Sequence, residues 1–90
     1  MPERVHVVVT GRVQGVFFRV TCAREARARG VTGWIRNRED GAVEAVFEGD
    51  PGRVGELVTW CGTGPGGADV TRVEVRTEAP QGVAGFEIVG

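Results

Sequence analysis

The sequence contains no lysine, so all 11 of its basic residues are arginine, and 12 acidic residues bring the net charge to −1. A protein that binds a nucleic-acid backbone normally carries an excess of positive charge, which this chain lacks. Cysteine is scarce as well: Cys22 and Cys61 have neither a CxxC partner nor a cluster of histidines beside them, the usual patterns of a zinc site. We therefore expect no nucleic-acid partner, no metal and no other cofactor.

Long apolar runs are also missing, since none approaches the roughly 20 residues that a membrane-spanning helix needs. The N-terminus passes directly into a valine-rich segment and lacks the pattern of a secretory signal. Two isolated cysteines are typical of small buried side chains in a reducing compartment, although a disulfide between Cys22 and Cys61 stays open as an alternative. These features predict a cytoplasmic protein that does not associate with membranes.

The chain is short, with 90 residues of which 41% are apolar. A chain of this size can bury one hydrophobic core but not two, so residues 1–90 are expected to form a single domain. We expect this domain to be a monomer. The only histidine, His6, falls on the strand face opposite to Val5, Val7 and Val9, and without an orienting partner nearby in the sequence it is interpreted as a surface residue rather than a general base.

Apolar spacing and turn residues predict seven elements along the chain. Alternating valines indicate the first strand, Asp40-Gly41 is a typical hairpin turn, and Asp50 followed by Pro51 is typical of a helix start. In chain order, the predicted elements are a strand over 4–10 that ends at Gly11, a helix over 18–29 capped by Gly30, strands over 31–38 and 42–48, a helix over 51–61, a strand from Val70 that ends before Pro80, and a short strand over 86–89.

This order is the split βαβ, or ferredoxin-like βαββαβ, arrangement of α+β domains, with a short edge strand added at the C-terminus. Both helices are expected to cover one face of the sheet. In this arrangement the loop after the first strand leads to the N-terminus of the first helix. We expect this loop to lie closer to the middle of the second strand than to the far end of its hairpin. Because the same fold supports many functions, function has to be argued from the residues of the site.

The segment Gly11–Arg19 has the features of an anion site. Gly11 and Gly15 allow the backbone to turn, and the amides that follow lie at a helix N-terminus, where unpaired N–H groups and the helix dipole favour a phosphate. The planar guanidinium of Arg19 can bind two phosphate oxygens at once. Two glycines and an arginine at this spacing are not specific by themselves, and they differ from the Gly-Lys-Ser/Thr pattern of nucleotide-binding loops.

Two segments together resemble one family closely. Gly11–Arg19 follows the pattern GxVQGVxFR and Gly33–Glu44 follows GWxxNxxDGxVE, which are the two signature blocks of the acylphosphatase family. The order of the predicted elements fits that family over nearly all 90 residues. One departure is Arg29, which stands where the family often has an apolar residue; another is Cys22, where polar or other small residues are common. Both affect packing rather than chemistry.

The resemblance implies metal-independent hydrolysis of the carboxyl-phosphate bond of a small-molecule acyl phosphate to a carboxylate and inorganic phosphate. It implies that Arg19 binds the phosphoryl group and that Asn37 positions the attacking water. The backbone amides expected to bind the phosphate, or another anion, belong to Gln14, Gly15, Val16, Phe17 and Phe18. A carboxylate is a good leaving group, so little acid catalysis is needed, and positioning with charge stabilisation can supply much of the rate.

Three alternatives to a standalone enzyme follow from the same features. The loop could belong to a binding module that senses a phosphorylated metabolite without turnover, or to a domain of a larger carbamoyl-transfer protein. RNA-recognition domains share the topology, but they need an aromatic sheet motif and a basic surface that are not evident here. We interpret Phe17, Phe18 and Trp34 as core or loop-wedging residues, and Arg12, Arg36 and Arg38 as surface charges that guide an anionic substrate.

Overall fold

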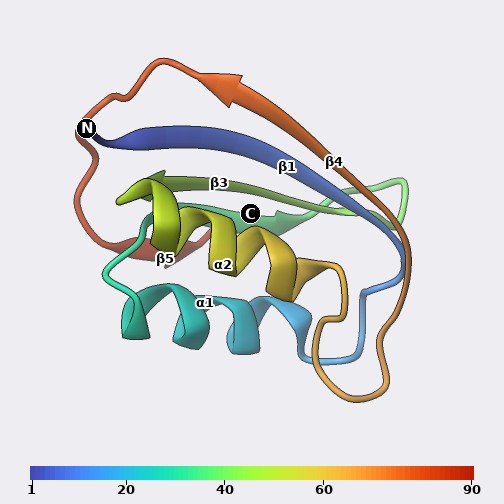
Figure 1. Cartoon of the computed structure of the whole chain (residues 1–90). Coiled ribbons are helices and arrows are strands. Elements are labelled where there is room, and N and C mark those ends of the chain that lie inside the picture. Colours follow the sequence, from blue (N-terminus) through green and yellow to red (C-terminus); the bar gives the residue numbers. More distant parts are fainter.

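A computed structural model describes all 90 residues as a five-stranded sheet with two helices packed on one of its faces (Figure 1). In chain order the elements are β1 (Glu3–Arg12), α1 (Phe18–Ala28), β2 (Thr32–Asn37), β3 (Val43–Gly49), α2 (Pro51–Cys61), β4 (Asp69–Glu78) and β5 (Phe86–Ile88). All seven predicted elements are present, and their ends differ from the predicted ends by two residues at most. Neither helix has the length and apolar character needed to cross a membrane.

The strands lie in the order β4-β1-β3-β2-β5, and only β2 and β5 run parallel to each other. This topology confirms the predicted ferredoxin-like fold with its short C-terminal edge strand. The β2–β3 hairpin is confirmed as well, although its loop is longer than a two-residue turn, because Arg38 N–H donates to the carbonyl of Ala42. Asp40 Oδ1 accepts from the Ala42 N–H at 3.0 Å and closes the turn.

The core lies between the helices and the sheet. Val5, Val7 and Val9 alternate along β1 toward the helices, as the sequence predicts, and each is at most 4% exposed. They belong to a cluster of 17 buried residues to which every element except β4 contributes; Val70 and Val73 of β4 pack against its margin. The cap at the start of α2 is also as predicted, since Asp50 Oδ2 accepts from the Arg53 N–H at 3.2 Å.

Gly11 does not end the first strand, and this part of the prediction is wrong. Strand β1 continues to Arg12 with a register shift between Thr10 and Gly11, where it crosses closely over the start of β4. A Cβ at Gly11 would lie 2.2 Å from the carbonyl oxygen of Asp69, so only glycine permits this approach. The chain turns later, at Gly15, whose φ is +75°.

The three aromatic residues have different environments. Phe18 is buried, as predicted, and packs against Trp60 with ring centroids 5.2 Å apart. The prediction is wrong for Phe17, whose side chain is 79% exposed at the start of α1. Trp34 is half-buried beside Val46 on the face of the sheet that the helices leave open, so it lies outside the main core.

The two cysteines are buried free thiols, as the sequence predicts for small core residues, and they come from α1 and α2. Contact with Cys61, together with burial, raises the pKa of the Cys22 thiol, which keeps it protonated at neutral pH. We therefore assign both cysteines to packing between the two helices.

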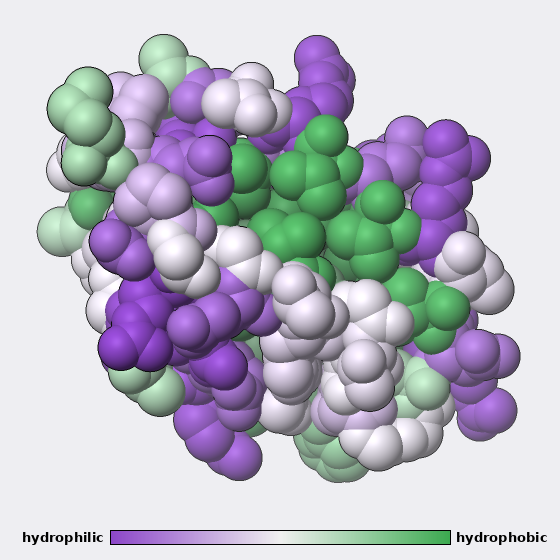
Figure 2. Space-filling view, viewed as in Figure 1, coloured by the Kyte–Doolittle hydropathy of each residue, from purple (hydrophilic) through white to green (hydrophobic).

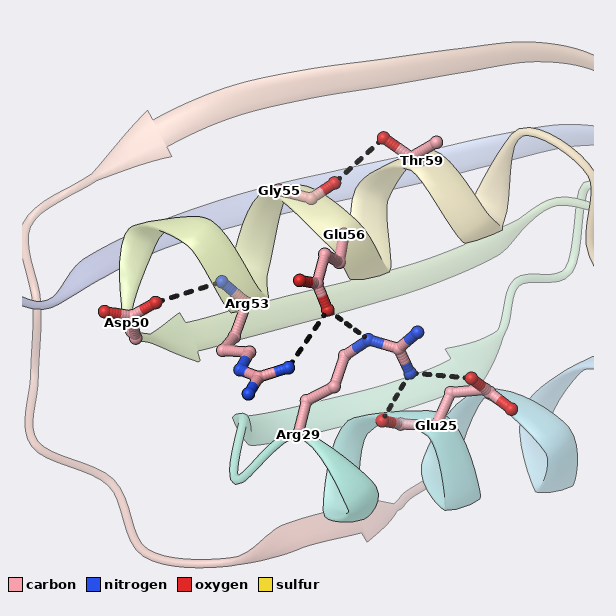
Figure 3. Close-up of polar contacts among 7 residues, drawn as sticks. All are labelled: Glu25, Arg29, Asp50, Arg53, Gly55, Glu56 and Thr59. Carbon is pink, nitrogen blue, oxygen red and sulfur yellow. Dashed lines mark hydrogen bonds and ion pairs between the residues drawn. The ribbon is translucent and has the colours of Figure 1, made fainter.

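Arg29 joins the two helices through ion pairs (Figure 3). Its Nη1 lies 2.6 Å from Oε1 of Glu25 on α1, and its Nε lies 3.1 Å from Oε1 of Glu56 on α2. The contacts with both carboxylates raise the pKa of the Arg29 guanidinium, with the Glu25 hydrogen bond as the largest cause. An arginine at this position is therefore accommodated by charge pairing between the helices rather than by burial, which agrees with its expected effect on packing alone.

On the open face of the sheet, Glu48 binds several groups. One of its oxygens accepts from Nη1 of Arg4 at 3.1 Å, and its carboxylate also accepts the N–H groups of Gln81 and Gly82 at 3.0 and 2.7 Å. Hydrogen bonds from this backbone, Gln81 first, lower the pKa of Glu48 despite burial. Glu48 therefore ties the segment between β4 and β5 to the sheet.

Replacing Glu48 by glutamine is expected to lower the unfolding midpoint at pH 7 by roughly 10 °C, because a buried charge partner of Arg4 is lost. Since the folded-state pKa of Glu48 is depressed, its stabilisation is present above the ordinary value of 4.5 and is lost as the pH falls through the folded pKa. Thermal unfolding of wild type and Glu48→Gln at pH 7 and pH 3 measures this, with exposed Glu87→Gln as control. A difference between the two proteins that does not shrink at pH 3 would contradict the assignment.

Candidate active site

A cavity of about 210 Å³ opens where the loop after β1, the first turn of α1 and the end of β2 meet. The expectation that this loop lies nearer the middle of β2 than the hairpin is wrong, because the loop packs against the hairpin end of that strand. Its lining includes Arg19 and Asn37, the two residues that the sequence singled out from separate segments. The complete lining consists of Val13, Gly15, Phe17, Phe18, Arg19, Val20 and Asn37. The structure thus brings both predicted catalytic residues and most of the predicted loop to one place.

Backbone N–H groups along this loop have no acceptor within the protein. None of the amides from residues 14–20 donates a hydrogen bond to the backbone or to a side chain, and the first helical hydrogen bond is Thr21 N–H to the carbonyl of Phe17, at 3.1 Å. No side chain caps the N-terminus of α1, and its first turn contains no acidic residue. Free amides and the positive end of the helix dipole therefore favour an anion here.

Phe17 holds the last turn of this loop in an unusual conformation. It is the only non-glycine residue with a positive φ, +63°, which costs roughly 1 kcal/mol for a residue with a side chain. Two hydrogen bonds from Thr21, one from its N–H and one from its hydroxyl at 2.8 Å, hold the Phe17 carbonyl in place. With its carbonyl held toward the helix, Phe17 fixes the direction of the amides around it.

Arg19 is half-buried and forms no ion pair with any carboxylate of the chain. A cation at a helix N-terminus is opposed by the helix dipole, so the position is unfavourable without an anion nearby. Arg19 is also the only arginine that lines the cavity. Its charge is therefore available to an anionic ligand bound by the loop.

Asn37 is the last residue of β2, and its Oδ1 atom is buried without a hydrogen-bond partner. Leaving such an acceptor unpaired costs about 1–3 kcal/mol, so it is uncommon in a folded protein. Asn37 also lines the cavity, so its side-chain amide is within reach of a molecule bound there, and a rotation of the amide would expose Oδ1 to that molecule. A water molecule that donates one proton to Oδ1 would point a lone pair elsewhere in the cavity.

Gln14 connects the loop to the hairpin that carries Asn37. Its side-chain Nε2 donates to the carbonyls of Arg38 and Ala42, at 2.8 and 3.0 Å, on either side of the hairpin loop. The sequence predicts only a backbone role for Gln14 and therefore misses this clamp. A glutamine flanked by Val13 and Gly15 in a glycine-rich loop is the only signal that could have indicated it.

Replacing Gln14 by alanine is expected to lower kcat/KM for an acyl phosphate by about 10- to 100-fold. The reason is that the loop and Asn37 would no longer be held at a fixed position relative to each other. The hairpin should also lose protection in amide hydrogen exchange, since Nε2 bonds two of its carbonyls. The matched control is Gln81→Ala, because Gln81 donates to Glu48 through its backbone N–H, which the substitution keeps. Unchanged kinetics and exchange in Gln14→Ala would contradict the positioning role.

Several other residues considered in the sequence lie outside this cavity. His6 bonds Glu44 through Nε2 at 2.6 Å, and this contact, more than the one from Arg36, lowers the pKa of Glu44. Arg36 pairs with Glu44 and Arg38 pairs with Asp40, at 2.7 and 2.9 Å, so nearby carboxylates offset both surface charges. No group of three or more His, Cys, Asp or Glu side chains is arranged to hold a metal ion.

Comparison with protein families finds one match over almost the whole chain. The family model described as acylphosphatase matches residues 5–88. An acylphosphatase from Thermococcus kodakarensis is 58% identical over 87 residues, which are 97% of this chain and 96% of that protein. An acylphosphatase from Haloarcula marismortui is 53% identical over 85 residues, or 94% of this chain and 93% of that protein. Similarity of this kind extends over the strands, the helices and both segments that form the cavity.

Solved structures agree with these matches. The crystal structure of acylphosphatase from Bacillus subtilis superimposes with a TM-score of 0.95 at 35% identity and covers the whole of both chains. A TM-score this close to 1 over both whole chains shows that the two proteins share one fold.

Proposed function

The chain belongs to the acylphosphatase family and has acylphosphatase activity, and from this premise we propose how its own residues hydrolyse an acyl phosphate. The observation that carries the proposal is the cavity in which seven consecutive unpaired amides, at 14–20, meet the free charge of Arg19 and the unpartnered Oδ1 of Asn37. Each of these three features is unfavourable in the absence of an anion or a polar molecule at this position. A bound phosphoryl group with an attacking water satisfies all of them.

The phosphoryl group is held by the loop and by Arg19. Amides of Gln14, Gly15, Val16, Phe17 and Phe18 donate to its non-bridging oxygens, and the guanidinium of Arg19 binds two of those oxygens at once. In the transition state the charge is spread over these three oxygens in a trigonal arrangement, so donors preorganised around that arrangement stabilise the transition state more than the bound substrate. Binding by the loop therefore contributes both affinity and rate.

Asn37 positions the nucleophile. Its Oδ1 accepts a hydrogen bond from one water molecule, and the water's oxygen attacks phosphorus from the side opposite the acyl oxygen. The new oxygen–phosphorus bond forms as the bond between phosphorus and the acyl oxygen breaks, and the acyl group leaves as a carboxylate with the electron pair. Asn is too weak a base to remove the water's proton, which passes to an oxygen of the phosphoryl group or of the departing carboxylate.

The leaving group needs little assistance. A carboxylate is weakly basic, so protonation by a general acid gains little at neutral pH. This agrees with the position of His6, which bonds Glu44 and does not line the cavity. The residues of this chain therefore act by positioning and by charge stabilisation rather than by proton transfer from a side chain.

Purified protein should hydrolyse benzoyl phosphate and acetyl phosphate at the same rate with and without a chelator. A loss of activity on chelation that added metal restores would contradict the metal-independent mechanism. Binding of phosphate without turnover of any acyl phosphate would favour the alternative of a phosphate-sensing module. We further infer a small-molecule substrate and a cytoplasmic setting, supported by the size of the cavity and by two buried free thiols.

A further inference from the structure

Strand β4 forms one edge of the sheet and pairs with β1 on one side only. In Figure 1 it runs along the outside of the molecule with no element beyond it. Most of its residues are exposed, and the strand is ten residues long, without proline and without a bulge from Arg72 to Glu78. Its outward N–H and C=O groups are therefore free to pair with another strand, a feature that proteins usually avoid on a long edge.

The two faces of β4 differ sharply. Val73, Val75 and Thr77 lie opposite Val9, Val7 and Val5 of β1, so they point to the side of the sheet on which the helices pack. Val75 is 45% exposed, and Figure 2 shows apolar side chains gathered at the surface between α2 and this edge. An apolar margin at the free edge would be covered by a strand added next to β4.

The other face of β4 carries charges of alternating sign at every second position. These residues are Arg72, Glu74, Arg76 and Glu78. Within the chain they are only loosely engaged, since Arg72 and Glu74 lie 3.5 Å apart and are both more than half exposed, and Arg76 has no ion pair. Glu78 uses Oε1 to accept from Arg4, which leaves its other oxygen free. Edge charges often keep strands apart, but alternating signs allow a strand to complement itself.

Self-pairing of β4 in antiparallel orientation can be examined register by register. If the two-fold axis passes through Val75, Glu74 lies opposite Arg76 of the second copy and Arg72 lies opposite its Glu78. Symmetry repeats both contacts, so every charge on this face is opposite a charge of the other sign, while Val75 meets Val75 and Val73 meets Thr77 on the apolar face. Opposed charges and β-branched pairs are the side-chain contacts that stabilise antiparallel sheets.

Neighbouring registers are less favourable. An axis through Glu74 places that carboxylate against its own copy and Arg72 against Arg76, which are like charges. An axis through Val73 keeps only the Arg72–Glu74 contacts and leaves Arg76 opposite Val70. An axis between two residues places the apolar face of one strand beside the charged face of the other. Charge and hydropathy therefore both select the register centred on Val75.

We propose that this chain forms a two-fold symmetric dimer in which the β4 strands pair antiparallel about Val75, so that the two sheets become one continuous sheet. A single strand pair buries little surface, so we expect a dissociation constant of the dimer in the micromolar range or above. The sequence alone predicts a monomer, because composition carries no information about a free edge. Residues 72–78 lie away from the cavity-lining residues, and the dimer therefore leaves both sites open.

Sedimentation equilibrium of wild type and charge-reversal variants tests the register. Glu74→Arg and Arg76→Glu each replace two attractive contacts by two repulsive ones, and each should raise the dimer Kd by about tenfold or more. The double variant E74R/R76E restores the pairs and should dimerise like wild type, and an equimolar mixture of the two single variants should form a heterodimer.

Acylphosphatase activity and the far-ultraviolet circular dichroism spectrum should be unchanged in every variant, which confirms folding. The control is Arg24→Glu, a charge reversal on exposed α1 surface.

Three results would overturn the proposal. The first is a wild type that stays monomeric at every concentration up to the solubility limit. The second is a dimer that both single variants leave intact. The third is a dimer that Arg72→Glu breaks while Arg76→Glu does not, because this pattern belongs to the register centred on Val73. None of these outcomes bears on whether the protein hydrolyses acyl phosphates, so the two proposals fail separately.

Discussion

Arg19→Ala is expected to lower kcat/KM for benzoyl phosphate by about 10³-fold or more, the largest effect of any single substitution in this chain. Arg19 is the only cationic residue that lines the cavity and has no carboxylate partner, so no other charge can replace it. Because its contacts strengthen as charge develops on the phosphoryl oxygens, kcat should fall, and KM and the inhibition constant of phosphate should rise. Both changes follow from one guanidinium serving binding and transfer.

Arg19→Lys separates charge from geometry. A lysine keeps the positive charge but cannot bind two oxygens in one plane, so its activity should lie between that of wild type and Arg19→Ala. Arg24→Ala is the matched control, since Arg24 is on the same helix, exposed, and absent from the cavity lining. The measurement is the steady-state kcat and KM of these proteins with benzoyl phosphate. If Arg19→Ala kept more than a tenth of wild-type kcat/KM, Arg19 would not bind the phosphoryl group.

Asn37→Ala should lower kcat by about 10²–10³-fold and leave KM and phosphate inhibition close to wild type. The reason is that Asn37 contacts the attacking water rather than the phosphoryl oxygens, so substrate binding does not depend on it. The same substitution removes a buried acceptor that has no partner, and thermal stability should therefore not decrease. A substitution that lowers turnover without lowering the stability of the fold is the expected signature of a functional position.

The kinetic and thermal measurements on Asn37→Ala must be made together. A rise in KM with kcat preserved would place Asn37 among the binding groups instead. A fall in the unfolding midpoint of more than about 5 °C, matched by an equal loss of active protein, would show a structural role. Thr32→Ala at the other end of β2 serves as the control for substitutions in this strand, because its hydroxyl bonds the carbonyl of Glu48 outside the cavity.

Much of the fold could be predicted because local signals agree with the tertiary structure. Alternating valines give β1 one buried face, and Asp50 with Pro51 starts α2 as the pattern indicates. The parallel addition of β5 to β2 was expected only as a short edge strand, since no local signal specifies its partner. For the site, Arg19 followed from its place at a helix start, whereas Asn37 depended on the family resemblance, because a lone Asn before a turn has no distinctive spacing.

Two of the errors, at Gly11 and Gln14, arise from contacts between segments distant in the sequence, and another arises because only one of two adjacent phenylalanines enters the core. Gly11 resembles a turn glycine, but its φ of +127° serves a close crossing with β4, which begins at Asp69. Phe17 resembles a core residue, but Phe18 takes the buried position and leaves Phe17 at the rim of the cavity. Gln14 has a side-chain role only because the hairpin at Arg38 and Ala42 folds against it.

The central claim is that one cavity binds the phosphoryl group through the loop amides and Arg19, and that Asn37 lies beside this group and positions the attacking water. Titration of ¹⁵N-labelled protein with inorganic phosphate, the reaction product, tests it most directly by nuclear magnetic resonance. We predict that the largest shifts occur at the amides of residues 14–20, at the Arg19 side chain and at the Asn37 side-chain amide, and that Arg19→Ala abolishes them. A second cavity lined by Arg36, Arg38, Glu39 and Asp40 offers the competing location. Shifts centred there, or unchanged by Arg19→Ala, would contradict the account.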